Sequence, residues 1–422
     1  MNSDEAAETF YCFACRCEHR GTTFRDHAGL FARVSCPTLG DRIFPLSSDA
    51  ELFAAFRKGE ISGSVHRRHQ FALLHITDQC SLRCPICYAE SGEGNPVPYE
   101  DVLRLARRTV AAGVRKLTLT GGEPAEHPDI LRIVSALAHD MKASVSLLTN
   151  GMRLASEESF ARNLKTAGLR KVHISFDTLS GETSLRMRGT DCVEQRKTAF
   201  ARAAEAGLAL AANVTVCDLN LDEVGEVFRY LASNVPGLSH VLFQPQCGLG
   251  RGVVRTRIDR EDVVKALARS PLFPVDDAYD FIPMPQVPAW GVGVHPDCGT
   301  LTSVVVDGCG GNAILRSLDA GRRGWTLLRR LAMIDGRPGL SATIRTLAAW
   351  MRHAGLSGLP LLGRWWRGGC GRHVVLAVVD NLPDADFMLV DRIRRCCSGV
   401  ACENGELAPV CAGYRIGRKE AP

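Results

Sequence analysis

Between residues 71 and 245 the chain alternates short, β-rich apolar runs with longer stretches of helical periodicity. The short runs predict six strands, at 71–77, 116–120, 144–149, 171–177, 208–216 and 240–244. Between the first two, one face of a predicted helix is formed by Val102, Leu105, Ala106, Thr109 and Val110. Repeated strand-helix units predict a parallel sheet, either doubly wound or curled into a partial or full β/α barrel.

Chemically distinctive residues follow most of these strands. A cysteine triplet follows the first strand and a Gly-Gly-Glu-Pro run the second, Asn150 follows the third, Ser175 and Asp177 close the fourth, and Gln244 closes the last. In a barrel the carboxyl ends of all strands converge on one rim, whereas a doubly wound sheet would scatter several of them. We therefore expect an α/β fold with a partial (β/α)6 barrel.

The cysteine triplet is Cys80, Cys84 and Cys87, with the spacing CxxxCxxC. Three thiolates at this spacing can hold three irons of a 4Fe-4S cluster and leave the fourth iron open to a small molecule. A structural zinc site would normally need a fourth Cys or His nearby, and three inert buried thiols are the other alternative. The spacing favours the open cluster.

The triplet followed by Tyr88, with Gly-Gly-Glu-Pro one β/α unit later, resembles the radical SAM superfamily. The resemblance implies that the reduced 4Fe-4S cluster cleaves S-adenosylmethionine (SAM) to a 5'-deoxyadenosyl radical, which removes hydrogen from an unactivated position. It implies that Cys80, Cys84 and Cys87 bind the cluster. It also implies a set of SAM-binding positions, with Glu123 and its glycines at the methionyl end: Tyr88, Gly121, Gly122, Glu123, Pro124, Asn150, Ser175, Asp177 and Gln244.

Further cysteines gather toward both ends, and we expect an N-terminal cysteine-rich segment at 1–60, the barrel core at 61–255 and a C-terminal region at 256–422. The N-terminal group predicts a rubredoxin-like iron or zinc site, with free thiols as the alternative: Cys12, Cys15, Cys17 and Cys36. The C-terminal group predicts an auxiliary 4Fe-4S cluster, with Cys309 or Cys402 as substitute ligands: Cys298, Cys396, Cys397 and Cys411.

These flanking motifs are similar to the tetraether lipid synthase group and to related methylases of the methanopterin pathway. The similarity includes Cys36-Pro37, Arg188-Gly189 and the strand end before Pro245. It implies carbon-carbon bond formation at an unactivated carbon of a lipid-like or heterocyclic substrate, by coupling or by alkylation such as methylation. Two alternatives stay open: a radical SAM peptide maturase with an auxiliary cluster, and a non-catalytic iron-sulfur redox sensor or electron carrier.

Composition narrows the class of protein further. The 422 residues are 45% hydrophobic and 23% charged, which is typical of a globular protein. No apolar run is long enough for a membrane span, and the N-terminus is acidic, so we expect a cytoplasmic enzyme. The net charge of +5 and the absence of a basic block with interleaved aromatics argue against a nucleic-acid partner. A reductant such as flavodoxin or ferredoxin is the expected protein partner.

One late stretch, 321–373, is rich in arginine and contains four of the five tryptophans. An apolar helical stripe within it comprises Ile344, Leu347, Ala348 and Met351. The stripe is typical of an ordinary packed helix with a solvated face, or of a helix lying on a membrane surface. The second alternative predicts peripheral membrane contact and favours a lipid-like substrate.

Overall fold

A curved parallel sheet forms the centre of the computed structural model, which describes residues 6–57, 69–89, 91–252, 256–283, 295–317, 373–381, 386–402 and 406–416, together with 344 and 348. Six strands follow one another in chain order across the sheet, all parallel. They are β5 (Phe71–Gln79), β7 (Lys116–Gly121), β8 (Ser144–Thr149), β9 (Lys171–Ser175), β10 (Ala209–Val216) and β11 (Leu238–Pro245). The predicted six-stranded partial barrel is confirmed, with each strand within a few residues of its expected bounds.

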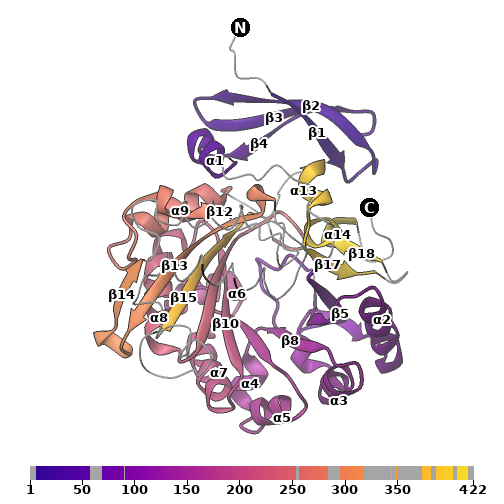
Figure 1. Cartoon of the computed structure of the whole chain (residues 1–422), viewed down its shortest axis with the longest axis vertical. Helices are drawn as coiled ribbons and strands as arrows, with labels where there is room; N and C mark the ends of the chain where they lie inside the picture. The colour runs from indigo at the N-terminus through magenta and orange to yellow at the C-terminus, as the bar shows by residue number, and fades with distance from the viewer. Residues whose placement is uncertain are drawn as a thin grey trace.

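The C-terminal region extends this sheet at both edges. β15 (His373–Asp380) pairs parallel with β11, and β17 (Ser398–Ala401) pairs parallel with β5. The order from β17 to β15 therefore contains eight neighbouring parallel strands. The strands that pair antiparallel with the sheet are β6 (Glu93–Pro96), β12 (Ile282–Pro283), β13 (Gly299–Asp307), β14 (Ile314–Ser317) and β18 (Leu407–Pro409). Two strands of the C-terminal region, β15 and β17, thus lie at opposite edges of the barrel sheet (Figure 1).

Helices cover one face of the sheet and form the main apolar core with it. These helices are α2 (Tyr99–Ala111), α3 (Ile130–Ser135), α4 (Met152–Ser156), α5 (Phe160–Thr166), α7 (Val193–Glu205), α8 (Val224–Asn234) and α9 (Arg260–Arg269). The stripe predicted for α2 is confirmed, because Val102, Ala106 and Thr109 are buried while Leu105 and Val110 pack at its margin. A further helix, α6 (Gly181–Arg188), follows β9, and its last residue approaches Cys84 of the cysteine triplet.

A separate antiparallel sheet lies above the barrel in Figure 1. Its order is β16-β1-β2-β3-β4, and its strands are β1 (Ala6–Cys12), β2 (Glu18–Asp26), β3 (Gly29–Cys36), β4 (Gly40–Ser47) and β16 (Phe387–Leu389). The helix α1 (Ala50–Arg57) then packs Phe53 and Phe56 around the buried guanidinium of Arg260 on α9. Segments from both ends of the chain therefore build this sheet.

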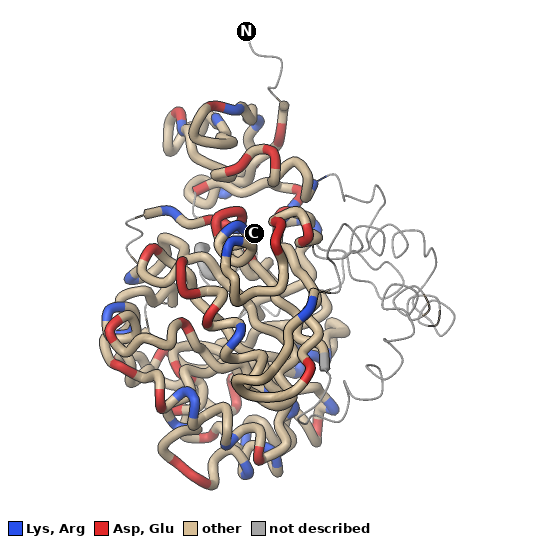
Figure 2. Tube along the Cα trace, turned by 90° about the vertical axis from the view of Figure 1, so that its left-hand side faces the viewer, with Lys and Arg blue, Asp and Glu red and all other residues tan. Residues whose placement is uncertain are grey.

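The described part of the C-terminal region also contains the 3-10 turns η4 (Ala278–Asp280), η6 (Pro296–Cys298) and η7 (Gly310–Asn312). Its helix α13 (Val390–Arg394) packs against β1 and β16, and α14 (Val410–Ile416) packs against β17 and β18. The arginine-rich stretch at 321–373, with its apolar stripe, lies almost wholly outside the described residues. Among the described residues, no helix is long and apolar enough to cross a membrane. Basic and acidic residues alternate over the described surface in Figure 2, in keeping with the small net charge.

Asp259 joins the upper sheet to the barrel and also caps α9. Its carboxylate accepts bonds from Ser48 N and Oγ at 2.5 and 2.9 Å, and it forms a capping box with Asp262. We expect Asp259→Ala to lower stability by about 1–2 kcal/mol, because the cap and the acceptor for Ser48 are both lost. Thermal unfolding should show a midpoint lower by about 2–6 °C, with the exposed Asp276→Ala as control. Equal midpoints for the two variants would contradict this role.

Candidate functional site at the carboxyl ends of the strands

The three cysteines of the triplet lie in the loop between β5 and β6. The loop is tied to its surroundings by main-chain bonds, with Cys80 N donating to Gly92 O at 2.9 Å. Ser81 is held by Glu126, which accepts from its N at 3.0 Å and from its Oγ at 2.5 Å. Glu126 follows the Gly-Gly-Glu-Pro run, so the loops after β5 and β7 are joined. All three thiols are free of disulfides, as an iron-sulfur site requires.

Two arginines approach the cysteine loop. Arg188 Nη1 lies 3.9 Å from Cys84 Sγ. Arg251 donates from its main-chain N to Cys87 O at 2.9 Å and from Nη1 to Ser91 O at 2.5 Å. The loop after β11 can pack this closely because residue 250 is glycine with φ +61°, where a Cβ would lie 2.5 Å from Cys87 O. Both cations complement the negative charge that three thiolates bring to one place.

The thiols themselves sit in unlike environments. Burial raises the pKa of Cys80 to about 12, and the nearby Glu123 and Glu126 add to the rise. Burial also acts to raise the pKa of Cys87. Hydrogen bonds from the main-chain N–H groups of Ser91 and Ala89 outweigh this effect, so the pKa of Cys87 is lowered. Binding to iron requires all three as thiolates, so iron would supply the charge that stabilises Cys80.

Asp177 is the charged centre beneath the cysteine loop. Its buried carboxylate accepts from Arg188 Nε and Nη2, both at 2.7 Å, and from Arg196 Nη1 at 2.8 Å. A fourth bond comes from Thr215 N at 3.0 Å. Although burial opposes it, the two arginines lower the pKa of Asp177 to about 2. Asp177 was predicted to contact SAM. In the structure its carboxylate oxygens accept hydrogen bonds from these protein groups, and Arg188, which it binds, is the residue that reaches Cys84.

The Gly-Gly-Glu-Pro run after β7 has a clear structural role. A Cβ on Gly121, whose φ is +147°, would lie 2.2 Å from Thr77 O, and one on Gly122 would lie 2.3 Å from Gln79 O. Only glycine therefore allows this close approach of the β7 end to β5. The Glu123 carboxylate is buried and accepts from Ala125 N at 2.9 Å, Thr149 Oγ1 at 2.7 Å and Asn150 N at 2.5 Å. Glu123 thus joins the ends of β7 and β8.

The remaining predicted SAM contacts lie along the same rim. Asn150 has a buried Nδ2 without a hydrogen-bond partner among the described residues, which leaves a donor for a ligand. Ser175 and Gln244 are half-buried at the ends of β9 and β11, and Pro124 begins a buried 3-10 turn. Tyr88 follows Cys87 directly. Free thiols, two adjacent cations and an unpaired amide donor together fit a cluster with a bound cofactor that carries a carboxylate and accepts hydrogen bonds.

The sequence profile of the radical SAM superfamily matches residues 74–231, from β5 into α8. This part of the chain is a radical SAM domain. The protein is therefore an enzyme of a class that uses a 4Fe-4S cluster and SAM.

Two curated relatives of this radical SAM protein are a 7,8-dihydro-6-hydroxymethylpterin dimethyltransferase from Methanocaldococcus jannaschii and a GTP 3',8-cyclase from Bradyrhizobium diazoefficiens. The first is 27% identical over 342 residues, covering 70% of this chain and 67% of the relative. The second is 29% identical over 222 residues, covering 48% and 64%. The matches thus span about two thirds of each relative. Among solved structures, SuiB from Streptococcus suis bound to precursor peptide SuiA has a TM-score of 0.43, with 17% identity over 51% of this chain and 47% of that one.

Outside the radical SAM domain, the N-terminal cysteines form a compact group. Cys12, Cys15 and Cys36 lie together, and the fourth member is His19, whose Nε2 is 3.0 Å from Cys15 Sγ. Cys17, which was predicted as a ligand, is exposed and bonds Cys15 O at 3.4 Å. His19 could have been noticed in the sequence only by allowing a mixed set of Cys and His ligands.

The predicted C-terminal set also comes together, around Arg392 of α13. Arg392 Nη2 lies 3.7 Å from Cys411 Sγ. Burial raises the pKa of Cys298, and the three other thiols of the set add to the rise. Of the described residues, only the Cys12 group has its donor atoms all within 4.8 Å of one another, so the C-terminal thiols are too widely spread for one metal ion. The 4Fe-4S cluster expected there stays a prediction. Of the two substitutes, Cys402 is buried and bonds Val400 O, and Cys309 is in a disulfide.

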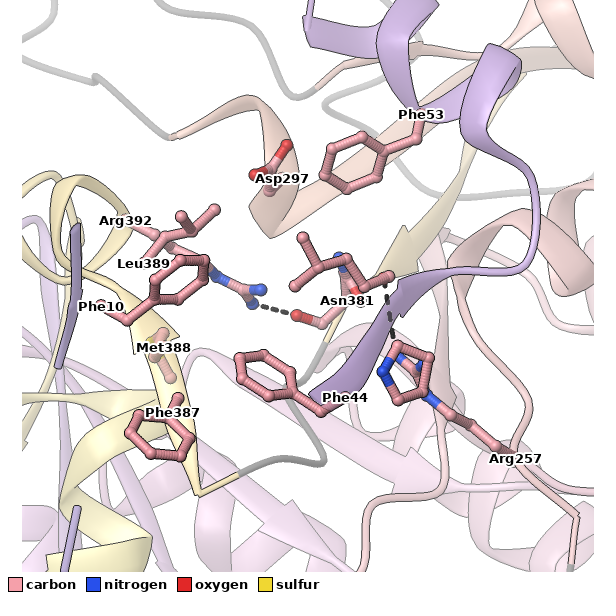
Figure 3. Close-up of a pocket in the computed structure, with 12 residues that line it drawn as sticks. Phe10, Phe44, Phe53, Arg257, Asp297, Asn381, Phe387, Met388, Leu389 and Arg392 are labelled. Atoms are coloured by element: carbon pink, nitrogen blue, oxygen red, sulfur yellow. Dashed lines mark hydrogen bonds between the residues drawn. The ribbon is translucent and has the colours of Figure 1, made fainter. Parts of the chain in front are cut away.

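A small cavity of about 50 Å³ lies in the seam between the upper sheet and the barrel (Figure 3). Phe10, Phe44 and Phe387 form its apolar side, and Asp297 and Arg392 line its polar side. Arg392 donates to the main-chain oxygen of residue 381 there. Organic ligands need cavities of roughly 300–1,000 Å³, so this space suits a few water molecules.

The Asp177 ion pairs give a direct test of how the site is held. We expect Asp177→Asn to cost about 3–5 kcal/mol at pH 7, because both arginines then lose a buried counter-charge. The unfolding midpoint should fall by on the order of 10 °C, with the exposed Asp218→Asn as control. Because the folded pKa is depressed, the native protein keeps this contribution above about pH 4 and loses it as the pH falls through about 2. A midpoint unchanged from the control would contradict the assignment.

Proposed function

We propose that this radical SAM enzyme forms a carbon-carbon bond, by alkylation such as methylation or by coupling, at an unactivated carbon of a polar heterocyclic substrate. The main support for this substrate class is the polarity of the sheet face opposite the helices. The sequence predicts a lipid-like or a heterocyclic substrate, and a polar face favours the heterocyclic one. A peptide maturase stays an alternative that no described residue favours.

Alternate residues of the barrel strands face away from the apolar core. The core face contributes Leu117, Leu147 and Val172 at 0% exposure. The opposite, inner face is half-buried and mainly polar, with Leu148 and Leu242 among its apolar members. Its polar members are Thr118, Ser146, Lys171, His173, Ser175, Asn213, His240 and Gln244. An inner face of this kind offers hydrogen bonds that a lipid chain could not use.

Two histidines stand out on this face. His173 pairs with the small Ala211 of β10, across which it meets His240, and the two rings lie 5.4 Å apart edge to face. Burial lowers the pKa of His173 to about 4 and that of His240 to about 3, and Lys171 adds to both shifts. Both imidazoles are therefore neutral at pH 7. Ser239 Oγ engages His240 Nδ1 at 3.0 Å and the Asn213 side chain bonds His173, so a ligand would use the other ring nitrogen of each. This suits the ring nitrogens and carbonyls of an uncharged heterocycle.

The named relatives agree with this substrate class, since one acts on a pterin and the other on GTP. When bound, the cluster and SAM supply a 5'-deoxyadenosyl radical for hydrogen removal, with electrons from a reductant such as flavodoxin or ferredoxin. The chain's own task is then to hold the cysteine loop, orient the substrate on the inner face and exclude water. No general base is needed for hydrogen-atom removal.

Radical initiation can be measured before the substrate is known. We expect the protein, purified without oxygen and reconstituted with iron and sulfide, to convert SAM to 5'-deoxyadenosine when dithionite is added. Cys84→Ala should abolish the product, because one of the three cluster ligands is lost. Cys17→Ala, which removes an exposed thiol, should match the native protein. An equal yield from Cys84→Ala would contradict the assignment of the triplet.

The substrate class is tested with matched probes. We expect 7,8-dihydro-6-hydroxymethylpterin or GTP to bind, measured by calorimetry, and to change the rate of 5'-deoxyadenosine formation. His173→Ala and His240→Ala should each weaken that binding by about tenfold, the value of one lost hydrogen bond of roughly 1.4 kcal/mol, and leave SAM binding unchanged. His139→Ala, an exposed histidine, is the control. Binding of phospholipid vesicles but not of either heterocycle would contradict the proposal.

A further inference from the structure

We infer that Cys12, Cys15, His19 and Cys36 bind one zinc ion, and that this ion anchors the C-terminal segment that carries the predicted auxiliary-cluster cysteines. The four donor atoms all lie within 4.8 Å of one another. Cys36 Sγ is 3.5 Å from Cys12 Sγ and 3.6 Å from Cys15 Sγ. The inference is independent of the reaction proposed above.

These distances suit a single tetrahedral ion. Zinc binds thiolate sulfur at about 2.3 Å, and a tetrahedron with that bond length separates its sulfurs by roughly 3.8 Å. The observed sulfur separations differ from this value by only a few tenths of an ångström. Three thiols and an imidazole make a complete Cys3His set, the kind of closed site in which zinc has a structural role.

The local fold explains why His19 is a ligand and Cys17 is not. Cys12 ends β1, and a tight turn follows in which Arg16 N donates to Cys12 O and Cys12 N to Cys17 O, both at 2.9 Å. Arg16 has φ 57°, the left-handed region, so the chain reverses sharply there. β2 then returns beside β1 with His19 opposite Phe10. The turn brings His19 back to the other ligands and leaves Cys17 exposed.

The sheet needs such an anchor because its own core is small. Besides Cys12 and Cys36, the buried cluster contains six side chains: Phe10, Ala32, Val34, Phe44, Phe387 and Leu389. A metal that binds the folded sheet and not the unfolded chain adds its binding free energy to stability. Mixed thiolate and imidazole ligation favours zinc over an all-sulfur iron site.

The ion also acts on the other end of the chain. β16 pairs with the metal-binding end of β1, with Cys12 opposite Phe387, and Phe13 N donates to Asp386 O at 2.9 Å. β16 continues into α13, which carries Arg392, and then into Cys396 and Cys397. Loss of the ion would therefore free β16 and loosen the segment that presents these two cysteines.

The experiment uses the full chain purified without oxygen and before any iron reconstitution. Elemental analysis should give one zinc per chain in the native protein and in Cys17→Ser, and none in Cys36→Ser or His19→Ala. Cobalt substituted for zinc should give the strong visible bands of a tetrahedral site. Zinc lost from Cys17→Ser, zinc retained in His19→Ala, or iron in place of zinc would each overturn the inference.

The anchoring role has its own readout. Hydrogen exchange of 386–394 should become faster in His19→Ala than in Cys17→Ser, while exchange in β8 stays unchanged. Equal exchange at 386–394 would overturn this role. His19→Cys covers the case in which His19→Ala fails to fold: it should keep one metal and slow exchange, with the cobalt bands shifted by the fourth sulfur. An His19→Cys protein without metal would overturn the site.

Discussion

The buried carboxylate of Asp177, held between two arginines, is the constraint on which the site depends. It lies after β9, and its partners come from α6, α7 and β10. One buried anion therefore fixes four neighbouring elements at the carboxyl end of the sheet. Because Arg188 continues from Asp177 to Cys84, the same interaction sets the position of the cysteine loop. Burying these charges is costly, and their mutual hydrogen bonds offset the cost.

The rest of the rim is joined strand by strand. Glu123 connects the ends of β7 and β8, Glu126 connects the loop after β7 to Ser81, and Arg251 connects the loop after β11 to Ser91. None of these bonds uses a polar side chain of the inner face of the barrel. The polar groups on that face, above all His173 and His240, are the reason that we favour a heterocycle over a lipid.

Much of the barrel could be predicted from sequence because each strand is buried on one face beside an amphipathic helix, which leaves a clear periodic signal. The triplet Cys80, Cys84 and Cys87 was equally visible, since its spacing is rare. The hydrogen-bond partners of the rim carboxylates could not be predicted from sequence. Asp177 and Glu123 have the residue type of cofactor ligands, yet their oxygens accept hydrogen bonds from other residues of the protein. Long-range pairings such as β16 with β1 join segments more than 370 residues apart, and no local pattern reports them.

The cysteine loop is expected to hold a 4Fe-4S cluster with one iron open to SAM. The most direct measurement is the electron paramagnetic resonance spectrum of the reduced, reconstituted protein, recorded with and without SAM. We expect a spectrum that shifts on addition of SAM and that disappears in Cys84→Ala, apart from any signal of an auxiliary cluster. A cluster signal from the native protein that is indifferent to SAM would contradict the claim and support an electron carrier or sensor.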